Sequence, residues 1–199
     1  MIEWVLASGN KGKLREFQQL VAGQGIRLVP QQALGILEVA ETGLSFVENA
    51  LIKARHASAI SGLPALADDS GLIVNALRGA PGLHTARYAG PEASADDNIN
   101  KLLAAMSGVP DAERTAHFVA VLAVVRDALD PCPLIAQGEW HGKILSARRG
   151  GSGFGYDPVF FDETYSLSAA EMSNELKNRL SHRGRAVEQL RSQLPKFNS

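Results

Sequence analysis

The sequence has one cysteine, no excess charge of either sign and no long apolar segment. Its cysteine, Cys132, has no partner for an intrachain disulfide, and nothing else in the chain is typical of a secreted protein. A net charge of −1 gives no overall attraction to nucleic acid, so DNA or RNA binding is not expected. The first apolar run is too short for a signal peptide, and no segment could cross a bilayer. We therefore expect a cytoplasmic protein that does not bind membranes.

Length and composition are those of an ordinary globular chain. The 199 residues are 45% hydrophobic and 21% charged. A chain of this size buries roughly 70% of its unfolded surface, which is enough for a substantial core. We expect residues 1–199 to form a single domain.

Strand and helix patterns alternate in the first half of the chain, and the middle is rich in strands. An apolar run at 2–7 predicts a strand, and the valine-rich run at 118–125 predicts a central strand buried on both faces. Capping boxes at Ser45–Glu48 and Ser94–Asp97 predict the starts of two helices. The fold expected is α/β, with a mixed twisted sheet and flanking helices.

Two further elements are expected in the second half. Residues 134–145 predict one or two strands, interrupted at Gly138 or Gly142. A last helix is expected to begin at Ser181 and to end at Pro195.

The segment Ser8 to Lys13 reads Ser-Gly-Asn-Lys-Gly-Lys and lies between the first expected strand and an amphipathic helix. Backbone N–H groups and the dipole at a helix N-terminus attract anions, so this doubly cationic turn indicates a phosphate-binding site. A solvated strand-to-helix loop is the alternative. The turn is not a Walker loop, because Ala7 and Leu14 stand where that motif needs Gly and Ser or Thr. P-loop ATPases and GTPases are therefore disfavoured.

An adjacent acid pair, Asp68-Asp69, follows a strand-like apolar run and precedes Ser70-Gly71. Buried carboxylates are costly unless they are paired or bind a metal, so the pair is a candidate catalytic or metal site. Neighbouring strand residues point to opposite faces, so one acid could face a ligand while the other supports the site. A solvated hairpin turn is the alternative. Glu41 is a weaker candidate for a second hard-metal ligand.

Residues 149–158 carry four glycines in six positions, interleaved with Phe154 and Tyr156. Such a backbone can wrap a ligand, and its rings could stack on a nucleobase, a contact worth about 1–3 kcal/mol. A flexible loop with its aromatic residues anchored in the core is the alternative.

The last expected helix begins with His182 and Arg183, at the end of a helix where positive charge is unfavourable. A residue that is unfavourable for local structure, with no evident stabilising contact in return, often belongs to a functional site. These side chains could donate hydrogen bonds to a ring carbonyl, and Lys177 could reach a phosphate or a base. A simply solvated helix start is the alternative.

These four segments together, in this order, resemble the non-canonical purine nucleoside triphosphate pyrophosphatases, also called inosine triphosphate pyrophosphatases. The resemblance covers essentially the whole chain. It implies a two-lobed α/β fold with an elongated mixed sheet and a nucleotide cleft, dependence on Mg²⁺, and a homodimer. It also implies Asp69 as the catalytic residue, with Glu41 and Asp69 serving the metal. The substrate-binding residues implied by position are Ser8, Gly9, Asn10, Lys11, Gly12, Lys13, Lys53, Ser70, Phe154, Gly155, Tyr156, Asp157, Lys177, His182 and Arg183.

The expected reaction is hydrolysis of ITP, dITP or XTP to the monophosphate and pyrophosphate, which would cleanse the nucleotide pool. Water attacks the α-phosphorus, and Asp69 either accepts its proton or acts only as a metal ligand. A base pocket rich in donors such as Arg183 would accept a 6-keto purine and reject adenine, because its buried donors would otherwise be unsatisfied. The alternatives are a pyrophosphatase for other modified nucleotides and a nucleotide-binding module without turnover.

Overall fold

The computed structural model describes residues 2–9, 13–14, 17–18 and 21–197. Its strands are β1 (Ile2–Leu6), β2 (Ile26–Pro30), β3 (Ala65–Val74), β4 (Thr115–Val125), β5 (Leu134–Ile144), β6 (Phe160–Asp162) and β7 (Leu167–Ser168). Its helices are α2 (Phe46–Ser61), α3 (Ala95–Ala105), α4 (Asn174–Leu180) and α5 (His182–Phe197). Short 3-10 segments include η1 (Gln31–Leu34) and η3 (Gly82–Arg87).

The described strands form one mixed sheet in the order β2-β1-β3-β4-β5-β6-β7. β1 pairs in parallel with β2 and with β3, whereas β6 is antiparallel to both β5 and β7. The pairing of β1 with β3 joins Val5 to Ala65 and Leu6 to Leu66. The expected α/β class, with a mixed sheet and flanking helices, is confirmed.

The chain divides into two compact units, and β3, β4 and β5 contribute residues to both. The first unit comprises residues 1–69, 120–137 and 186–199, and the second comprises residues 70–119 and 138–185. The single domain expected over the whole chain stays a prediction.

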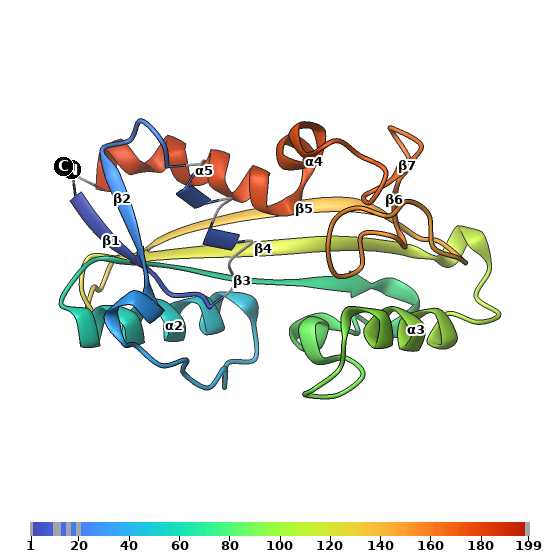
Figure 1. Ribbon diagram of the computed structural model, residues 1–199, viewed down its shortest axis with the longest axis horizontal. Helices are drawn as coiled ribbons and strands as arrows, with labels where there is room; N and C mark the ends of the chain where they lie inside the picture. The colour runs from blue at the N-terminus through green and yellow to red at the C-terminus, as the bar shows by residue number, and fades with distance from the viewer. Residues whose placement is uncertain (1, 10–12, 15–16, 19–20, 198–199) are drawn as a thin grey trace. The chain divides into compact units, whose positions relative to one another are not determined.

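The first unit has its own apolar core. α2 and the part of α5 that follows residue 185 lie on opposite faces of its strands (Figure 1). α5 contributes Val187, Leu190 and Leu194 to a buried cluster that includes Trp4 and Leu122. This core supports β1 and β3, the strands that carry or precede the first group of predicted site residues.

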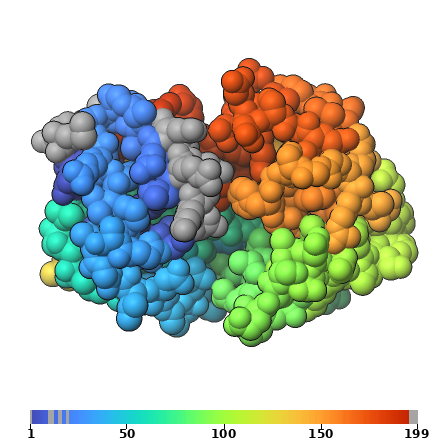
Figure 2. Space-filling view, viewed as in Figure 1, coloured from blue at the N-terminus to red at the C-terminus, as the bar shows by residue number. Residues whose placement is uncertain are grey.

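The second unit has a separate apolar core. Ile99 and Leu102 of α3 pack in a cluster with Leu72, Tyr156 and Trp140. At the surface, α3 (green) and the segment around β6 (orange) form adjoining parts of this unit (Figure 2). The core therefore includes a residue of the glycine-rich segment, which anchors that segment to β3 and α3.

Both predicted helix starts are confirmed, and the capping box is complete at Ser94–Asp97. The Ser45 side chain accepts a hydrogen bond from the Glu48 N–H at 3.4 Å, and α2 begins at the next residue. The Ser94 side chain accepts from the Asp97 N–H, and the Asp97 carboxylate accepts from the Ser94 N–H at 2.9 Å. Local side-chain chemistry thus defines where these helices begin.

One alternative and two local expectations are wrong. β3 runs through Asp68 and Asp69 as a continuous strand, so the acid pair is not a hairpin turn. β5 is also continuous, and Gly142 is needed because a side chain there would collide with the Phe161 carbonyl. α5 continues to Phe197 and includes Pro195, which costs the last turn one N–H donor without ending the helix.

None of the helices in the described part of the chain has the length and apolar character needed to span a bilayer.

Candidate functional site

In the first unit, Lys53 of α2 binds two carboxylates at once. Its Nζ lies 2.7 Å from Asp69 Oδ1 on β3 and 2.9 Å from Glu41 Oε1 in the segment before α2. It also donates to the Asp68 carbonyl at 2.9 Å. The side chains of Lys53 and Asp69 are only 15% and 11% exposed, so this is a largely buried charge cluster. The cluster brings together three predicted site residues that are distant in the sequence.

Burial and charge act in opposite directions on this cluster. Burial raises the pKa of the Asp69 carboxyl, and the nearby Glu41 and Asp68 raise it further, while Lys53 lowers it; the net shift is upward. Burial alone would lower the pKa of the Lys53 ammonium, but Asp69 and Glu41 outweigh that effect and the pKa is raised. Lys53 therefore stays charged, and Asp69 is a stronger base than an ordinary aspartate.

The other acid of the pair, Asp68, binds a different lysine. Its Oδ2 lies 2.9 Å from Lys13 Nζ, and the Asp68 side chain is fully buried. Neighbouring residues on a strand point to opposite faces, which is why the two acids bind two lysines. The two acids therefore face different surroundings, and the separate roles expected of them stay a prediction.

Ser8 and Gly9 follow directly after β1, as expected for the start of a phosphate-binding turn. A side chain on residue 9 would collide with the ends of Gln32 and Glu38, so the glycine allows these side chains to approach the backbone. Asn10, Lys11 and Gly12 lie outside the described residues. Lys13 is helical, which agrees with a turn followed by a helix.

The donor set of this cluster suits a hard divalent cation. Mg²⁺ is commonly held by one or two carboxylates together with substrate phosphates and water. Glu41 and Asp69 are such a pair, and each is within hydrogen-bond distance of the same Lys53 ammonium. Among the described residues there is no group of three or more acidic, histidine or cysteine ligands. The residues present therefore fit a cation that takes its remaining ligands from substrate and water.

In the second unit, the glycine-rich segment is closed by Asp157. Its buried carboxylate accepts a hydrogen bond from the Phe154 N–H at 2.7 Å and forms an ion pair with Lys177 of α4. Gly153 has φ +87°, and a side chain there would collide with the Asp157 carboxylate. The glycine is therefore required both for the backbone conformation and for the tight turn around Asp157.

The two aromatic residues of this segment differ in exposure. Phe154 is 52% exposed, and Lys177 Nζ lies 4.5 Å from its ring centroid. Tyr156 is only 3% exposed, and its hydroxyl donates to the Thr85 carbonyl at 2.9 Å. The interpretation of both rings as stacking surfaces is therefore wrong for Tyr156, whose ring is part of the core.

His182 and Arg183 are buried, so the alternative of a solvated helix start is wrong. The His182 ring stacks on Phe118 with 4.8 Å between centroids and 14° between planes. Arg183 donates to the Ser70 hydroxyl at 3.4 Å. The Ser181 hydroxyl accepts from the Gly184 N–H at 3.1 Å, which satisfies one donor of this helix end. Two predicted residues, Ser70 and Arg183, are thus in contact although 113 positions separate them.

Thr85 was not predicted from the sequence. It contacts both β3 and Tyr156, through hydrogen bonds that connect residues 13 and 71 positions apart. No periodicity or motif marks such a residue, because its contacts depend on the folded path of η3.

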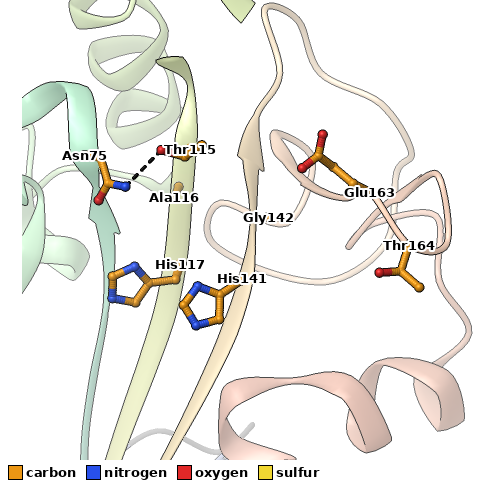
Figure 3. Close-up of a pocket in the computed structure, with 8 residues that line it drawn as sticks. All are labelled: Asn75, Thr115, Ala116, His117, His141, Gly142, Glu163 and Thr164. Atoms are coloured by element: carbon orange, nitrogen blue, oxygen red, sulfur yellow. Dashed lines mark hydrogen bonds between the residues drawn. The ribbon is translucent and has the colours of Figure 1, made fainter. Parts of the chain in front are cut away.

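A pocket of about 300 Å³ lies elsewhere in the second unit and contains none of the predicted site residues (Figure 3). His117 and His141 stack at one wall with 5.1 Å between ring centroids, and Asn75 donates to the Thr115 hydroxyl at 2.9 Å. The lining of the pocket is mixed in polarity, and it includes none of Ser70, Asp157 and Arg183.

Comparison with known proteins identifies the family of this chain. The model of the Ham1 family matches residues 4–193. The chain is 62% identical to a dITP/XTP pyrophosphatase from Methylococcus capsulatus over 190 residues, covering 96% of this chain and 94% of the relative. It is 60% identical to a protein of the same name from Xanthomonas oryzae pv. oryzae, covering 96% of each.

Solved structures agree as well. A HAM1 protein from Coxiella burnetii has a TM-score of 0.94 and 47% identity, covering 98% of this chain and 100% of the other. The Ham1 protein of Staphylococcus aureus has a TM-score of 0.89 and 35% identity, covering 98% and 99%. The family resemblance drawn from the four sequence segments is confirmed, and the chain belongs to the Ham1 family.

Proposed function

We propose that this protein hydrolyses non-canonical purine nucleoside triphosphates, namely dITP, ITP and XTP, to the monophosphate and pyrophosphate. The observation that carries the proposal is near-full-length identity of about 60% to relatives named dITP/XTP pyrophosphatase. The buried cluster of Lys53, Asp69 and Glu41 supports it, because it combines a cation for phosphate with carboxylates for water and metal. The biological purpose is removal of deaminated purine nucleotides before polymerases use them.

The triphosphate is bound by residues of the first unit in this proposal. Both sides of the reaction carry heavy negative charge, so the main need is for positioning and charge neutralisation. Lys13 and Lys53 are held in place by Asp68 and Asp69. We expect backbone N–H groups of the Ser8–Lys13 segment to donate to the phosphates as well.

Asp69 is the proton acceptor for the attacking water in this proposal. The oxygen of water bonds to the α-phosphorus, the bond from that phosphorus to the bridging oxygen breaks, and pyrophosphate leaves. An aspartate of ordinary pKa, about 3.9, is a weak base. Burial raises the pKa of Asp69, which brings it closer to the pH at which general bases work best.

Glu41 and Asp69 would hold Mg²⁺ in this proposal. When bound, the ion would offset phosphate charge and increase the acidity of water. Lys53 links the same two carboxylates, so it fixes their separation and offsets their mutual repulsion.

The base is bound by residues of the second unit in this proposal. Phe154 offers an exposed ring for stacking, and Lys177, His182 and Arg183 contribute polar groups. Arg183 is buried and can only donate hydrogen bonds. A donor of this kind matches a 6-keto oxygen and is left unsatisfied by the 6-amino group of adenine. ATP is therefore expected to be a poor substrate.

A pyrophosphate-release assay tests the proposal. Purified protein is incubated with XTP, dITP or ATP, in Mg²⁺ or in excess EDTA. We expect pyrophosphate from XTP and dITP in Mg²⁺, little from ATP, and none in EDTA. Absence of pyrophosphate in every arm would overturn the proposal in favour of a nucleotide-binding module. The homodimer and the cytoplasmic location stay predictions.

A further inference from the structure

We propose that Thr85 is a positioning residue for the pyrophosphatase site, fixing both Ser70 on β3 and the 153–157 segment. The inference rests on the proposed function. It is carried by two hydrogen bonds that Thr85 accepts, one from the Leu72 N–H at its side-chain hydroxyl and one from the Tyr156 hydroxyl at its backbone carbonyl.

The first bond completes an edge of β3. β1 pairs with β3 only as far as Leu66, so the peptide groups farther along that strand need other partners. The Leu72 N–H donates to Thr85 Oγ1 at 2.8 Å, and Ile73 forms an isolated bridge with Pro81. The bridge at Pro81 and the hydroxyl of Thr85 in η3 thus give this edge of β3 partners at Leu72 and Ile73, two and three residues after Ser70.

The Thr85 hydroxyl is used both as an acceptor and as a donor. While it accepts from Leu72, it donates to the Gly82 carbonyl at 2.6 Å. These two bonds fix the orientation of the hydroxyl and hold η3 in a tight turn. Serine can make both bonds, whereas valine has nearly the same shape and can make neither.

The second bond anchors the glycine-rich segment. The buried Tyr156 hydroxyl donates to the Thr85 carbonyl at 2.9 Å. A buried hydroxyl without a partner is costly, so this bond fixes how deeply the Tyr156 ring sits. Phe154 and Asp157 lie within two residues of Tyr156, so the depth of that ring sets the position of the proposed base-binding residues.

Thr85 therefore connects two groups of proposed substrate contacts. Ser70 is held by Arg183 on one side and lies beside the strand segment that Thr85 fixes on the other. If the hydroxyl is lost, η3 can shift, and the carbonyl that receives Tyr156 shifts with it. Once the bond from Leu72 to the Thr85 hydroxyl is lost, the bond from Tyr156 to the Thr85 carbonyl should position the 153–157 segment less well.

The experiment measures kcat and KM for dITP, together with the melting temperature, in five proteins besides wild type. The test variants are Thr85→Val, Thr85→Ser, Tyr156→Phe and the double variant of Thr85→Val with Tyr156→Phe. The matched control is Thr115→Val, which also loses one threonine hydrogen bond in the second unit, to Asn75, and touches none of the proposed contacts (Figure 3).

We expect Thr85→Val to lower kcat/KM about tenfold with a higher KM, a loss on the scale of one hydrogen bond. Thr85→Ser should stay close to wild type, as should Thr115→Val. Tyr156→Phe should raise KM, and the double variant should lose less than the product of the two single losses, because the two bonds act through one residue. A residue that served stability alone would lower the melting temperature and the active fraction without changing KM.

An unchanged KM in Thr85→Val would overturn the inference, as would independent effects in the double variant, while the proposed function would stand. A wild-type protein that releases no pyrophosphate from dITP would overturn the proposed function and this inference with it.

Discussion

At the scale of single residues, the adjacent acids of β3 show how one strand supplies two different environments. Asp68 is fully buried and binds Lys13, whereas Asp69 shares Lys53 with Glu41. A buried carboxylate beside two others would be unfavourable alone, and the ammonium of Lys53 makes it tolerable. We propose the catalytic role for Asp69 rather than Asp68 because Asp69 and Glu41 place two carboxylates around one lysine, whereas Asp68 forms an ion pair with Lys13.

Replacing Asp69 by Asn tests that assignment. The amide is similar in size but cannot accept the proton or bind a cation equally well, so turnover should fall by about 10²–10⁴-fold. The far-ultraviolet circular dichroism spectrum should be unchanged. Asp111→Asn is the matched control, because it breaks another 2.7 Å lysine pair at an exposed position. Near wild-type turnover in Asp69→Asn would contradict the assignment.

The pH dependence tests the charge cluster. Because burial raises the pKa of Asp69, the ionised form predominates only at a higher pH than for an ordinary aspartate. As pH is lowered, kcat/KM should therefore begin to fall at a higher pH than it would with an ordinary aspartate. Lys53→Gln removes the cation that lowers this pKa, so the pH below which kcat/KM falls should be higher still.

Lys143→Gln serves as the control for this profile, since Lys143 binds Asp111 and not the cluster. An acid side that stays in place, or moves to lower pH, in Lys53→Gln would contradict the account. The same shift affects stability: the free-energy cost of ionised Asp69 in the folded state is complete above the raised pKa, shrinks as pH falls through it, and disappears only below the ordinary pKa that the group has in the unfolded chain.

Sequence reasoning found most of the candidate residues, and its misses have physical causes. The acid pair and the cationic helix start break local rules of burial and charge, so they are visible in the sequence. The burial of Tyr156 could not be predicted, because a glycine-rich segment does not define which of its rings turns inward. Thr85 has no sequence signal, because its partners are backbone groups of other elements.

At the scale of elements, the glycines of the 149–158 segment differ in what they permit. Gly153 has a positive φ and no room for a side chain, whereas an added methyl group on Gly151 would meet nothing within 4 Å. Glycine is therefore required at 153, where the chain turns around Asp157, but not at 151. The sequence shows only that glycine is abundant.

Gly153→Ala tests this difference. The new methyl group would be forced against the Asp157 carboxylate in an unfavourable backbone conformation, which costs about 1–3 kcal/mol. We expect KM for XTP to rise about tenfold, since 1.4 kcal/mol corresponds to one factor of ten. Gly151→Ala should bind XTP as wild type does. Equal KM values for the two variants would show that the turn does not position substrate contacts.

Helix starts were predictable and helix ends less so. Capping boxes are local, so Ser45 and Ser94 predicted α2 and α3 correctly. Pro195 did not end α5, because packing of Leu190 and Leu194 in the core of the first unit stabilises the helix around it. Tertiary contacts of this kind override the local preference of proline for ending a helix, and they cannot be predicted from a short stretch of sequence.

At the scale of the whole molecule, the fold class could be predicted because strand and helix patterns alternate along the chain. The division into two units could not be seen in the composition, because β3, β4 and β5 each run through both. No linker rich in glycine or proline separates the units. Three continuous strands pass from one to the other instead.

Ligand-linked stability tests the proposal that a nucleotide binds at the predicted site residues. A product monophosphate at about 100 times its Kd should stabilise the folded state by about 2.7 kcal/mol, a rise in Tm of roughly 5–11 °C. Hydrogen exchange should slow both at 65–69 and at 154–157. Absence of protection at 65–69 would contradict phosphate binding near Asp69, and absence of protection at 154–157 would contradict base binding by Phe154.

The most direct measurement of the central claim is product analysis in ¹⁸O-labelled water, with dITP and dATP present in equal amounts and Mg²⁺ added. We predict dIMP with one labelled oxygen on its phosphate, unlabelled pyrophosphate, and dATP largely unconsumed. Release of orthophosphate, label in pyrophosphate, or equal consumption of dATP would contradict the account.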